Sequence, residues 1–204
     1  MTISAVIFDV GNVLYPWDPR ILYERLIPDG QALDAFLHDV VTHEWHFQHD
    51  QGRDFADTSA ELSAVHPQHR ALIALWGPRF MDSIGPVLPG MRDIVEGLDA
   101  RGVPLFGITN FSHEFWPPFR AREAAMFDHF RDIVVSGDEK MVKPDPAIYR
   151  LALDRFGVAA DAALFIDDRL ENVEGARAVG MMAHHFTDAG RLRAELVGLG
   201  LLSI

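Results

Sequence analysis

AVIFDVGNVL, residues 5–14, decides the fold: four apolar residues lead into Asp9, and the chain turns directly after it through Gly11 and Asn12. A buried strand that ends on a carboxylate presents that carboxylate at the C-terminal edge of its sheet. In open α/β sheets this edge is where ligands bind. The stretch therefore predicts that Asp9 belongs to a functional site.

Strands alternate with helices in the second half of the chain. Apolar runs at 103–108, 133–135, 163–166 and 181–186 predict strands, the last of them at an edge of the sheet. Apolar residues at helical spacing predict helices between them, and Gly102, Gly157 and Gly180 stand where such helices end. This order predicts an α/β fold, in which a parallel sheet carries helices on both faces.

Residues 16–88 interrupt the alternation. Their apolar residues follow a helical period almost throughout, as at 33–41, and no stretch among them is typical of a strand. Prolines and glycines near 15–19 and 86–90 mark two hinges. We therefore expect a core domain of residues 1–15 and 89–204, and a helical domain of residues 16–88 inserted above Asp9.

Composition restricts the classes of function. The chain of 204 residues has a net charge of −12, which disfavours binding to nucleic acid and to anionic membrane surfaces. It has no cysteine, and no apolar run of about 18 residues that could span a bilayer. We expect a cytoplasmic protein that acts on a small molecule, with no nucleic acid or membrane partner; the oligomeric state stays open.

Two further polar positions mark the ends of predicted elements, one after a strand and one before a helix. Thr109 and Asn110 end the strand at 103–108, where a hydroxyl and backbone N–H groups can hold phosphate oxygens; a plain turn is the alternative. Lys143 stands before a proline, in an extended approach to a helix. Its ammonium could neutralise both Asp9 and a phosphoryl group, or could simply lie in solvent.

A pair of carboxylates, Asp167 and Asp168, follows the strand expected at 163–166. Adjacent carboxylates at the end of a buried strand repel each other unless a cation is present. Asp168, Asp9 and the backbone carbonyl of Gly11 would make a plausible Mg²⁺ site, since Mg²⁺ prefers oxygen ligands. Asn172 could support these ligands by hydrogen bonds. The alternative is a capping cluster for the next helix.

The motifs FDVGNV at 8–13, TN at 109–110, KP at 143–144 and DD at 167–168 together resemble the haloacid dehalogenase-like (HAD-like) hydrolase superfamily. The resemblance implies a Rossmann-like core with an α-helical cap inserted after the first motif. It also implies that Asp9 is the nucleophile, Thr109 and Lys143 are phosphate ligands, and Asp168 is a metal ligand. Residues 8–14 and 165–168 are most similar to the branch that holds bacterial glucose-1-phosphate phosphatase.

Gly11 departs from the family pattern. Most phosphatases of this superfamily carry a second aspartate at this position as general acid and base, which contributes about 10²–10⁴-fold to the rate. Glycine favours a substrate with an easier leaving group, such as an anomeric phosphate, or a proton donor from the inserted helices. Candidate donors there are His43, Glu44, His46, His49 and Asp50. A zinc site made by the three histidines is less favoured, because on a helix they fan over about 120°.

Three functions follow from these residues. We expect a Mg²⁺-dependent phosphatase of a small phosphorylated metabolite, such as a sugar phosphate, that works through an aspartyl-phosphate intermediate. A 2-haloacid dehalogenase would use the same Asp9 without metal, but that branch usually has an aromatic residue in place of Gly11 and Ser-Asn in place of the acidic pair. A weakly active protein that binds a phosphorylated ligand is the third alternative.

Overall fold

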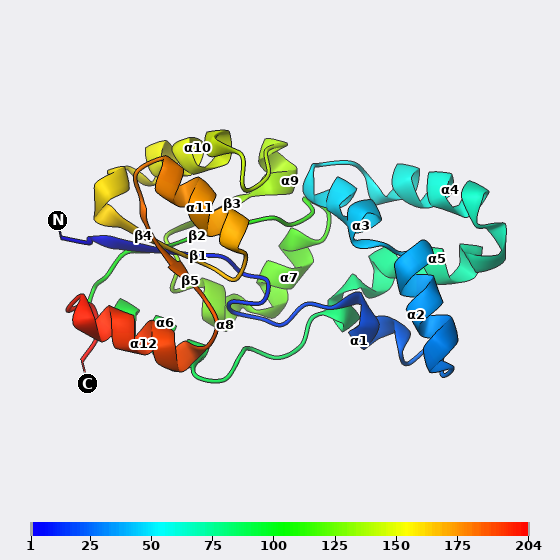
Figure 1. Cartoon of the computed structure of the whole chain (residues 1–204), viewed down its shortest axis with the longest axis horizontal. Coiled ribbons are helices and arrows are strands. Elements are labelled where there is room, and N and C mark those ends of the chain that lie inside the picture. Colours follow the sequence, from blue (N-terminus) through cyan, green and yellow to red (C-terminus); the bar gives the residue numbers. More distant parts are fainter. Residues whose placement is uncertain (1, 204) are drawn as a thin grey trace.

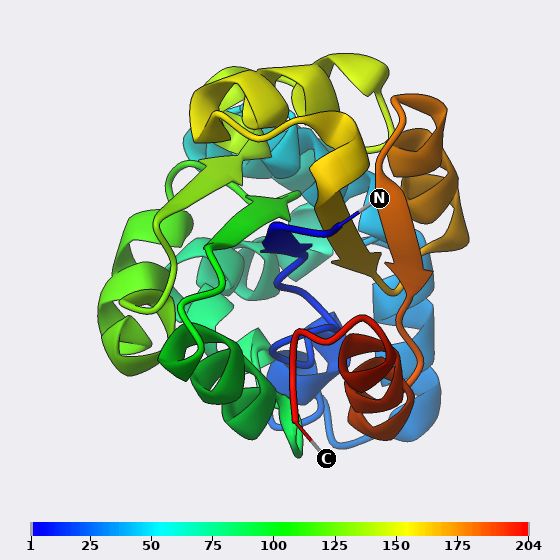
Figure 2. The ribbon, with the colours of Figure 1, turned by 90° about the vertical axis from the view of Figure 1, so that its left-hand side faces the viewer.

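The computed structural model describes residues 2–203. One sheet of parallel strands, in the order β3-β2-β1-β4-β5, forms the centre of the molecule (Figures 1 and 2). Its strands are β1 (Ala5–Phe8), β2 (Leu105–Thr109), β3 (Asp132–Val135), β4 (Ala163–Asp167) and β5 (Met182–His185). Every expected strand is present within two residues of its predicted bounds, and β5 lies at an edge as expected.

The sheet is covered by helices on both faces, which confirms the expected α/β class (Figure 2). Alternate residues of β1 point to opposite faces, so Val6 and Phe8 join one apolar cluster while Ala5 and Ile7 join the other. The first cluster includes residues of α6 (Met91–Ala100) and α12 (Ala189–Gly198), and the second includes residues of α10 (Pro146–Phe156) and α11 (Leu170–Ala178). Burial on both sides explains why β1 is apolar throughout.

Helix ends follow the sequence signals. Gly102, Gly157 and Gly180 all adopt positive φ angles, of 73°, 64° and 94°. Asp145 caps α10, because its side chain accepts a hydrogen bond from the Ala147 N–H at 2.8 Å. Shorter elements complete this part of the chain: α7 (Trp116–Arg122), α8 (Ala124–Phe127), α9 (Ser136–Glu139) and the 3₁₀ helix η3 (Ala160–Ala162).

Residues 16–88, which we call the helical insert, contain helices and no strand (Figure 1). Its elements are α1 (Pro19–Tyr23), α2 (Gly30–Asp39), α3 (His43–Asp50), α4 (Phe55–Val65), η1 (Pro67–His69), α5 (Arg70–Arg79) and η2 (Phe80–Ser83). Aromatic side chains fill its interior: the rings of Tyr23 and Trp76 stack at 5.9 Å between centroids. The insert lies beyond the carboxyl ends of the strands, with α3 turned toward the sheet (Figure 1).

The chain enters and leaves the helical insert along two segments that lie side by side. Trp17 and Ile84 form an antiparallel bridge between them. The Gly85 N–H donates to the Pro16 carbonyl at 2.9 Å, and the Leu88 N–H donates to the Leu14 carbonyl at 2.8 Å. Within residues 2–203 no helix has both the length and the apolar character that crossing a membrane requires.

Candidate active site

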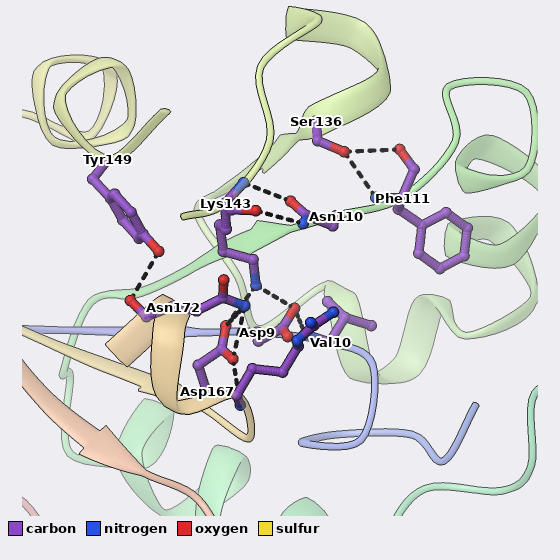
Figure 3. A network of polar contacts seen from close by, with 10 residues as sticks. Asp9, Val10, Asn110, Phe111, Ser136, Lys143, Tyr149, Asp167 and Asn172 are labelled. Carbon is purple, nitrogen blue, oxygen red and sulfur yellow. Dashed lines mark hydrogen bonds and ion pairs between the residues drawn. The ribbon is translucent and has the colours of Figure 1, made fainter. Parts of the chain in front are cut away.

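Asp9 lies directly after the central strand β1, and segments from distant parts of the sequence meet around it (Figure 3). Its side chain is buried, and Oδ1 accepts a hydrogen bond from the Val10 N–H at 2.7 Å. The backbone of Asp9 remains part of the sheet, since its N–H donates to the Ile166 carbonyl at 2.8 Å. The nucleophile expected from the sequence is therefore held in a fixed position at the carboxyl edge of the sheet.

Lys143 is the cation of the site. Its Nζ lies 2.8 Å from Oδ1 of Asp9 and 2.7 Å from Oδ2 of Asp167, so one ammonium bridges two carboxylates (Figure 3). The Lys143 side chain is fully buried, which excludes the solvated lysine considered as an alternative. Burial would lower the pKa of Lys143, but the carboxylates of Asp167 and Asp9 raise it above its ordinary value. The ammonium is therefore charged when it faces Asp9.

Asp167 holds Lys143 in place. Its carboxylate accepts hydrogen bonds from the Asn172 side-chain amide at 3.0 and 3.1 Å, and from the Arg169 N–H at 2.9 Å. Asn172 is positioned in turn by Tyr149, whose hydroxyl donates to the Asn172 carbonyl at 2.9 Å (Figure 3). The sequence predicted that Asn172 supports the metal ligands by hydrogen bonds. In the structure the Asn172 amide bonds to Asp167, the residue before the proposed ligand Asp168.

Asn110 and Lys143 join the ends of two segments through a reciprocal pair of hydrogen bonds. The Asn110 amide donates to the Lys143 carbonyl at 3.1 Å, and the Lys143 N–H donates to the Asn110 side-chain oxygen at 2.9 Å (Figure 3). Thr109 is buried at the end of β2, and its side chain does not line the cavity described below, whereas Asn110 does. The proposed contact of Thr109 with phosphate stays a prediction.

Asp168 completes a group of three carboxylates. Oxygens of Asp9, Asp167 and Asp168 all lie within 4.8 Å of one another. Burial raises the pKa of Asp9 to about 8, with Asp167 adding to this effect and Lys143 opposing it, and burial also raises the pKa of Asp168. One ammonium therefore does not balance three carboxyls, and a further cation would favour their ionised forms. Oxygen donors in this number and spacing fit Mg²⁺.

A cavity of about 310 Å³ opens onto these groups. Asp9, Gly11, Asn110, Lys143 and Asp168 line it from the sheet side. The opposite wall comes from the helical insert, through Trp17, Asp18, Pro19, His43, His46, Phe47, Asp50 and Phe80. Each of the four sequence motifs contributes a residue to the lining of this cavity: Asp9, Asn110, Lys143 and Asp168.

The proton donors considered in the insert separate into two sets. His43, His46 and Asp50 line the cavity, whereas Glu44 is exposed outside it and His49 bonds through Nε2 to the Thr58 hydroxyl at 2.7 Å. The three histidines do not belong to either group of residues that could hold a metal within residues 2–203. The spacing of these histidines along one short helix gave no sign of which of them would face the sheet.

Comparisons with known proteins agree with this geometry. A family model described as haloacid dehalogenase-like hydrolase matches residues 3–180. The chain is 30% identical to the sesquiterpene phosphatase astK of Aspergillus oryzae over 92% of each chain. It is 33% identical to the phosphatase MT3486 of Mycobacterium tuberculosis, over 97% of this chain and 93% of that protein.

A solved structure shows the same fold. The HAD family enzyme bt-2542 from Bacteroides thetaiotaomicron, in a magnesium complex, superimposes with a TM-score of 0.72 at 18% identity and covers 97% of this chain and 99% of its own. The expected α/β fold and the expected hydrolase class are confirmed, while the glucose-1-phosphate phosphatase branch stays a prediction. The chain belongs to the haloacid dehalogenase-like hydrolase family.

Proposed function

We propose that this hydrolase is a Mg²⁺-dependent phosphatase that cleaves a small phosphorylated metabolite through an aspartyl-phosphate intermediate. The observation that carries the proposal is the buried ammonium of Lys143, 2.8 Å from Oδ1 of Asp9 in a cavity that also contains Asp168. A phosphoryl group needs a nucleophile in line with the leaving oxygen, and positive charge around its own oxygens. Asp9 would be the nucleophile and Lys143 would supply positive charge at this edge of the sheet.

Each residue has a definite role in this reaction. Asp9 attacks phosphorus and forms the acyl phosphate, which water later hydrolyses. Lys143 balances the charge of the phosphoryl oxygens, together with backbone N–H groups near Thr109 and Asn110. Asp167 and Asn172 act indirectly, because they fix the ammonium of Lys143 through buried hydrogen bonds.

Asp9, Asp168 and the carbonyl of Gly11 would hold Mg²⁺. The bound ion would supply positive charge that neutralises phosphoryl oxygens during transfer. Burial raises the pKa values of Asp9 and Asp168 because it removes water from their carboxylates, and repulsion by Asp167 adds to this effect. A bound cation would offset both effects, which supports a metal site there.

The helical insert is proposed to act as a cap domain, with residues 1–15 and 89–204 as the core domain. It closes the cavity on the side opposite the strands, so it would exclude bulk water and contact the organic part of the substrate. Aromatic side chains line this part of the cavity: Trp17, Phe47, Phe80 and, from the core, Phe111.

These aromatic walls favour an apolar organic phosphate over a sugar phosphate, because sugar hydroxyls need polar partners once water is removed. The relative from Aspergillus oryzae, 30% identical, is named a sesquiterpene phosphatase, which supports the same choice. We therefore expect terpenyl or other alkyl phosphates to be better substrates than glucose 1-phosphate.

A dehalogenase with the same nucleophile is less well supported. Its reaction requires no cation, yet Asp168 places a third carboxyl beside Asp9 and Asp167, where only one ammonium is available. A protein that only binds a phosphorylated ligand would not need the fixed geometry of Asp9, but it would share the rest of the site.

A screen of phosphate esters, run with Mg²⁺ and with EDTA, tests the proposal. It should include farnesyl phosphate, glucose 1-phosphate and p-nitrophenyl phosphate, with 2-chloropropionate to detect dehalogenation. We expect Mg²⁺-dependent phosphate release that the Asp9→Asn variant lacks. Halide release in EDTA, or binding of Mg²⁺ and phosphate without turnover of any ester, would contradict the proposal.

A further inference from the structure

Asp50 is a buried carboxyl and one of the candidate proton donors of the helical insert. It is the last residue of α3 in the helical insert, its side chain is 9% exposed, and it lines the same cavity as Asp9. Its Oδ1 has no hydrogen-bond partner within residues 2–203, and the nearest basic group, Nε2 of His46, is 3.6 Å away. A buried polar atom without a partner is costly, so its presence beside a reaction site calls for a function.

The position of Asp50 is fixed by the core. The Ser136 hydroxyl of α9 donates to the backbone carbonyl of Asp50 at 2.6 Å and also contacts Phe111. This contact ties the end of α3 to the part of the chain that follows β3. The backbone of Asp50 is therefore fixed, while Oδ1 of its carboxyl stays free to interact with a molecule in the cavity.

Phosphoryl transfer needs its proton donor on the side of phosphorus opposite the nucleophile, and Asp50 lies on the side of the cavity formed by the helical insert. Asp9 reaches phosphorus from the carboxyl edge of the sheet, and an in-line reaction places the leaving oxygen on the far side of phosphorus. The helical insert, which carries Asp50, lines the cavity from the other side, so a leaving oxygen placed there would face the insert. Gly11, at the position where most relatives carry their acid, has no side chain that could serve there.

We propose that Asp50 is the general acid and base of this enzyme, in place of the side chain that Gly11 lacks. In the first step the bond from Asp9 to phosphorus forms, the bond from phosphorus to the leaving oxygen breaks, and the carboxyl of Asp50 gives its proton to that oxygen. In the second step water attacks phosphorus and gives a proton to the Asp50 carboxylate, while the bond from phosphorus to the Asp9 oxygen breaks and leaves its electron pair on Asp9. The proposal rests on the phosphatase function proposed above.

The electrostatic surroundings of Asp50 suit an acid that is neutral before the reaction. Burial raises its pKa well above the ordinary value, Asp9 across the cavity adds to this effect, and Lys143 opposes it. On its own helix, His46 is a neutral neighbour, since burial lowers the pKa of its imidazole and the nearby His49 and His43 act in the same direction. From α9, the group that contacts Asp50 is the uncharged hydroxyl of Ser136.

The other titratable groups of the cavity are less suited. The Lys143 ammonium is engaged by Asp9 and Asp167, and Asp18 is exposed and accepts a hydrogen bond from the Arg20 N–H at 2.8 Å. The pKa of His43 is lowered, chiefly by burial, which leaves this half-exposed ring without a proton to spare at neutral pH. Asp50 combines a buried position, a free oxygen and a proton.

The test compares two esters that differ in their need for an acid. Nitrophenolate can leave without a proton, whereas an alkoxide needs one. Asp50→Asn should therefore lower kcat for hexyl phosphate by roughly 10²–10⁴-fold. With p-nitrophenyl phosphate it should slow the first step, the release of nitrophenolate, far less. The slower second step should make the phosphorylated protein accumulate with p-nitrophenyl phosphate, which mass spectrometry after acid quenching detects. Asp57→Asn, the same change at an exposed residue of α4, is the matched control and should behave as wild type.

Equal rates for wild type and Asp50→Asn on hexyl phosphate would overturn the proposal, and so would an equal loss on both esters without accumulation of the phosphorylated protein. In either case the wild type would still hydrolyse p-nitrophenyl phosphate with Mg²⁺, and the phosphatase function would stand. Hydrolysis of neither ester by the wild type would overturn the phosphatase function and this inference with it.

Discussion

Lys143 donates a hydrogen bond to Asp167 at 2.7 Å, although neither side chain reaches solvent. Such a pair costs much desolvation free energy, and only further hydrogen bonds make it tolerable. Here Asn172 and the Arg169 N–H supply those bonds to Asp167, while Asp9 supplies the second carboxylate to Lys143. Stability and reactivity therefore depend on the same buried charges.

Lys143→Met should destabilise the fold by about 3–5 kcal/mol, because it leaves the carboxyls of Asp9 and Asp167 without their cation. Urea unfolding, followed by circular dichroism in EDTA, measures the loss. The chain has only one other lysine, Lys140, which is exposed, so Lys140→Met is the matched control and should change little. Equal stability of the two variants would mean that the buried ammonium contributes nothing net to folding.

Asp9→Asn should reduce turnover on the order of 10⁴–10⁶-fold, since the amide keeps the shape of the side chain but cannot attack phosphorus. Phosphate release from p-nitrophenyl phosphate measures the rate, and the circular dichroism spectrum checks the fold. Asn retains an oxygen that can accept the hydrogen bond from the Val10 N–H, so we expect a native spectrum. Turnover near the wild-type rate would remove Asp9 from its role.

Asp168→Ala should weaken Mg²⁺ binding by roughly 10- to 100-fold, because it removes one of the carboxylates proposed as ligands. Isothermal titration calorimetry without substrate measures the affinity directly. The exposed Asp161, just before β4, offers the control Asp161→Ala. Unchanged affinity in Asp168→Ala would place the metal elsewhere.

Asp50 should make stability fall as the pH rises. Because burial raises its pKa above the ordinary 3.8, the native state holds the proton more tightly than the unfolded state. The contribution of Asp50 to the free energy of unfolding is complete below pH 3.8 and is lost as the pH rises through the raised pKa of the native state. It amounts to about 1.4 kcal/mol for each unit by which the native pKa exceeds the unfolded pKa.

Asn cannot titrate, so the stability of Asp50→Asn should decline less between pH 4 and pH 9 than that of the wild type. Urea unfolding of both proteins in EDTA at a series of pH values measures the difference. Subtracting one curve from the other removes the titration that the two proteins share and leaves the contribution of Asp50, including its interaction with Asp9. Parallel curves would show that Asp50 has an ordinary pKa.

Gly11→Asp should restore the hydrolysis of hexyl phosphate to the Asp50→Asn variant. A Cβ at Gly11 would meet no atom within 4 Å among the described residues, and the φ angle of Gly11 is not positive, so a side chain can begin there without backbone strain. An acid at this position would replace the proton that Asp50 no longer supplies. If the double variant stayed as slow as Asp50→Asn, the role of Asp50 would not be proton transfer.

The sequence predicted those parts of the site that depend on strand ends. Asp9 and Asp168 follow apolar runs, and parallel strands bring their carboxyl ends to one edge, so their proximity follows from the fold alone. Lys143 could be predicted as a site residue because its motif follows the order of the family motifs. The residues next to it in the sequence did not indicate that its side chain would be fully buried.

The remaining parts depend on tertiary packing that no local pattern encodes. The partner of Asn172 is Asp167 and not Asp168, because the turn after β4 points the first carboxyl inward. The sequence could not show which acidic residue of α3 faces the core. In the structure Asp50 is buried, whereas Glu44 is exposed. The buried residues of this helix are the apolar Trp45 and the polar His46, His49 and Asp50, so no hydrophobic period marks which polar side chain faces the cavity.

The bridge between Trp17 and Ile84 holds the two chain crossings of the helical insert side by side. Since both crossings run side by side, the whole segment can be lengthened, shortened or replaced while the spacing of the strands stays as it is. In this chain such an exchange would also remove Asp50 and the aromatic walls, but would leave Asp9, Lys143 and Asp168 in place. Replacing the helical insert would thus change substrate choice and acid catalysis together. The nucleophile, which belongs to the core domain, would stay the same.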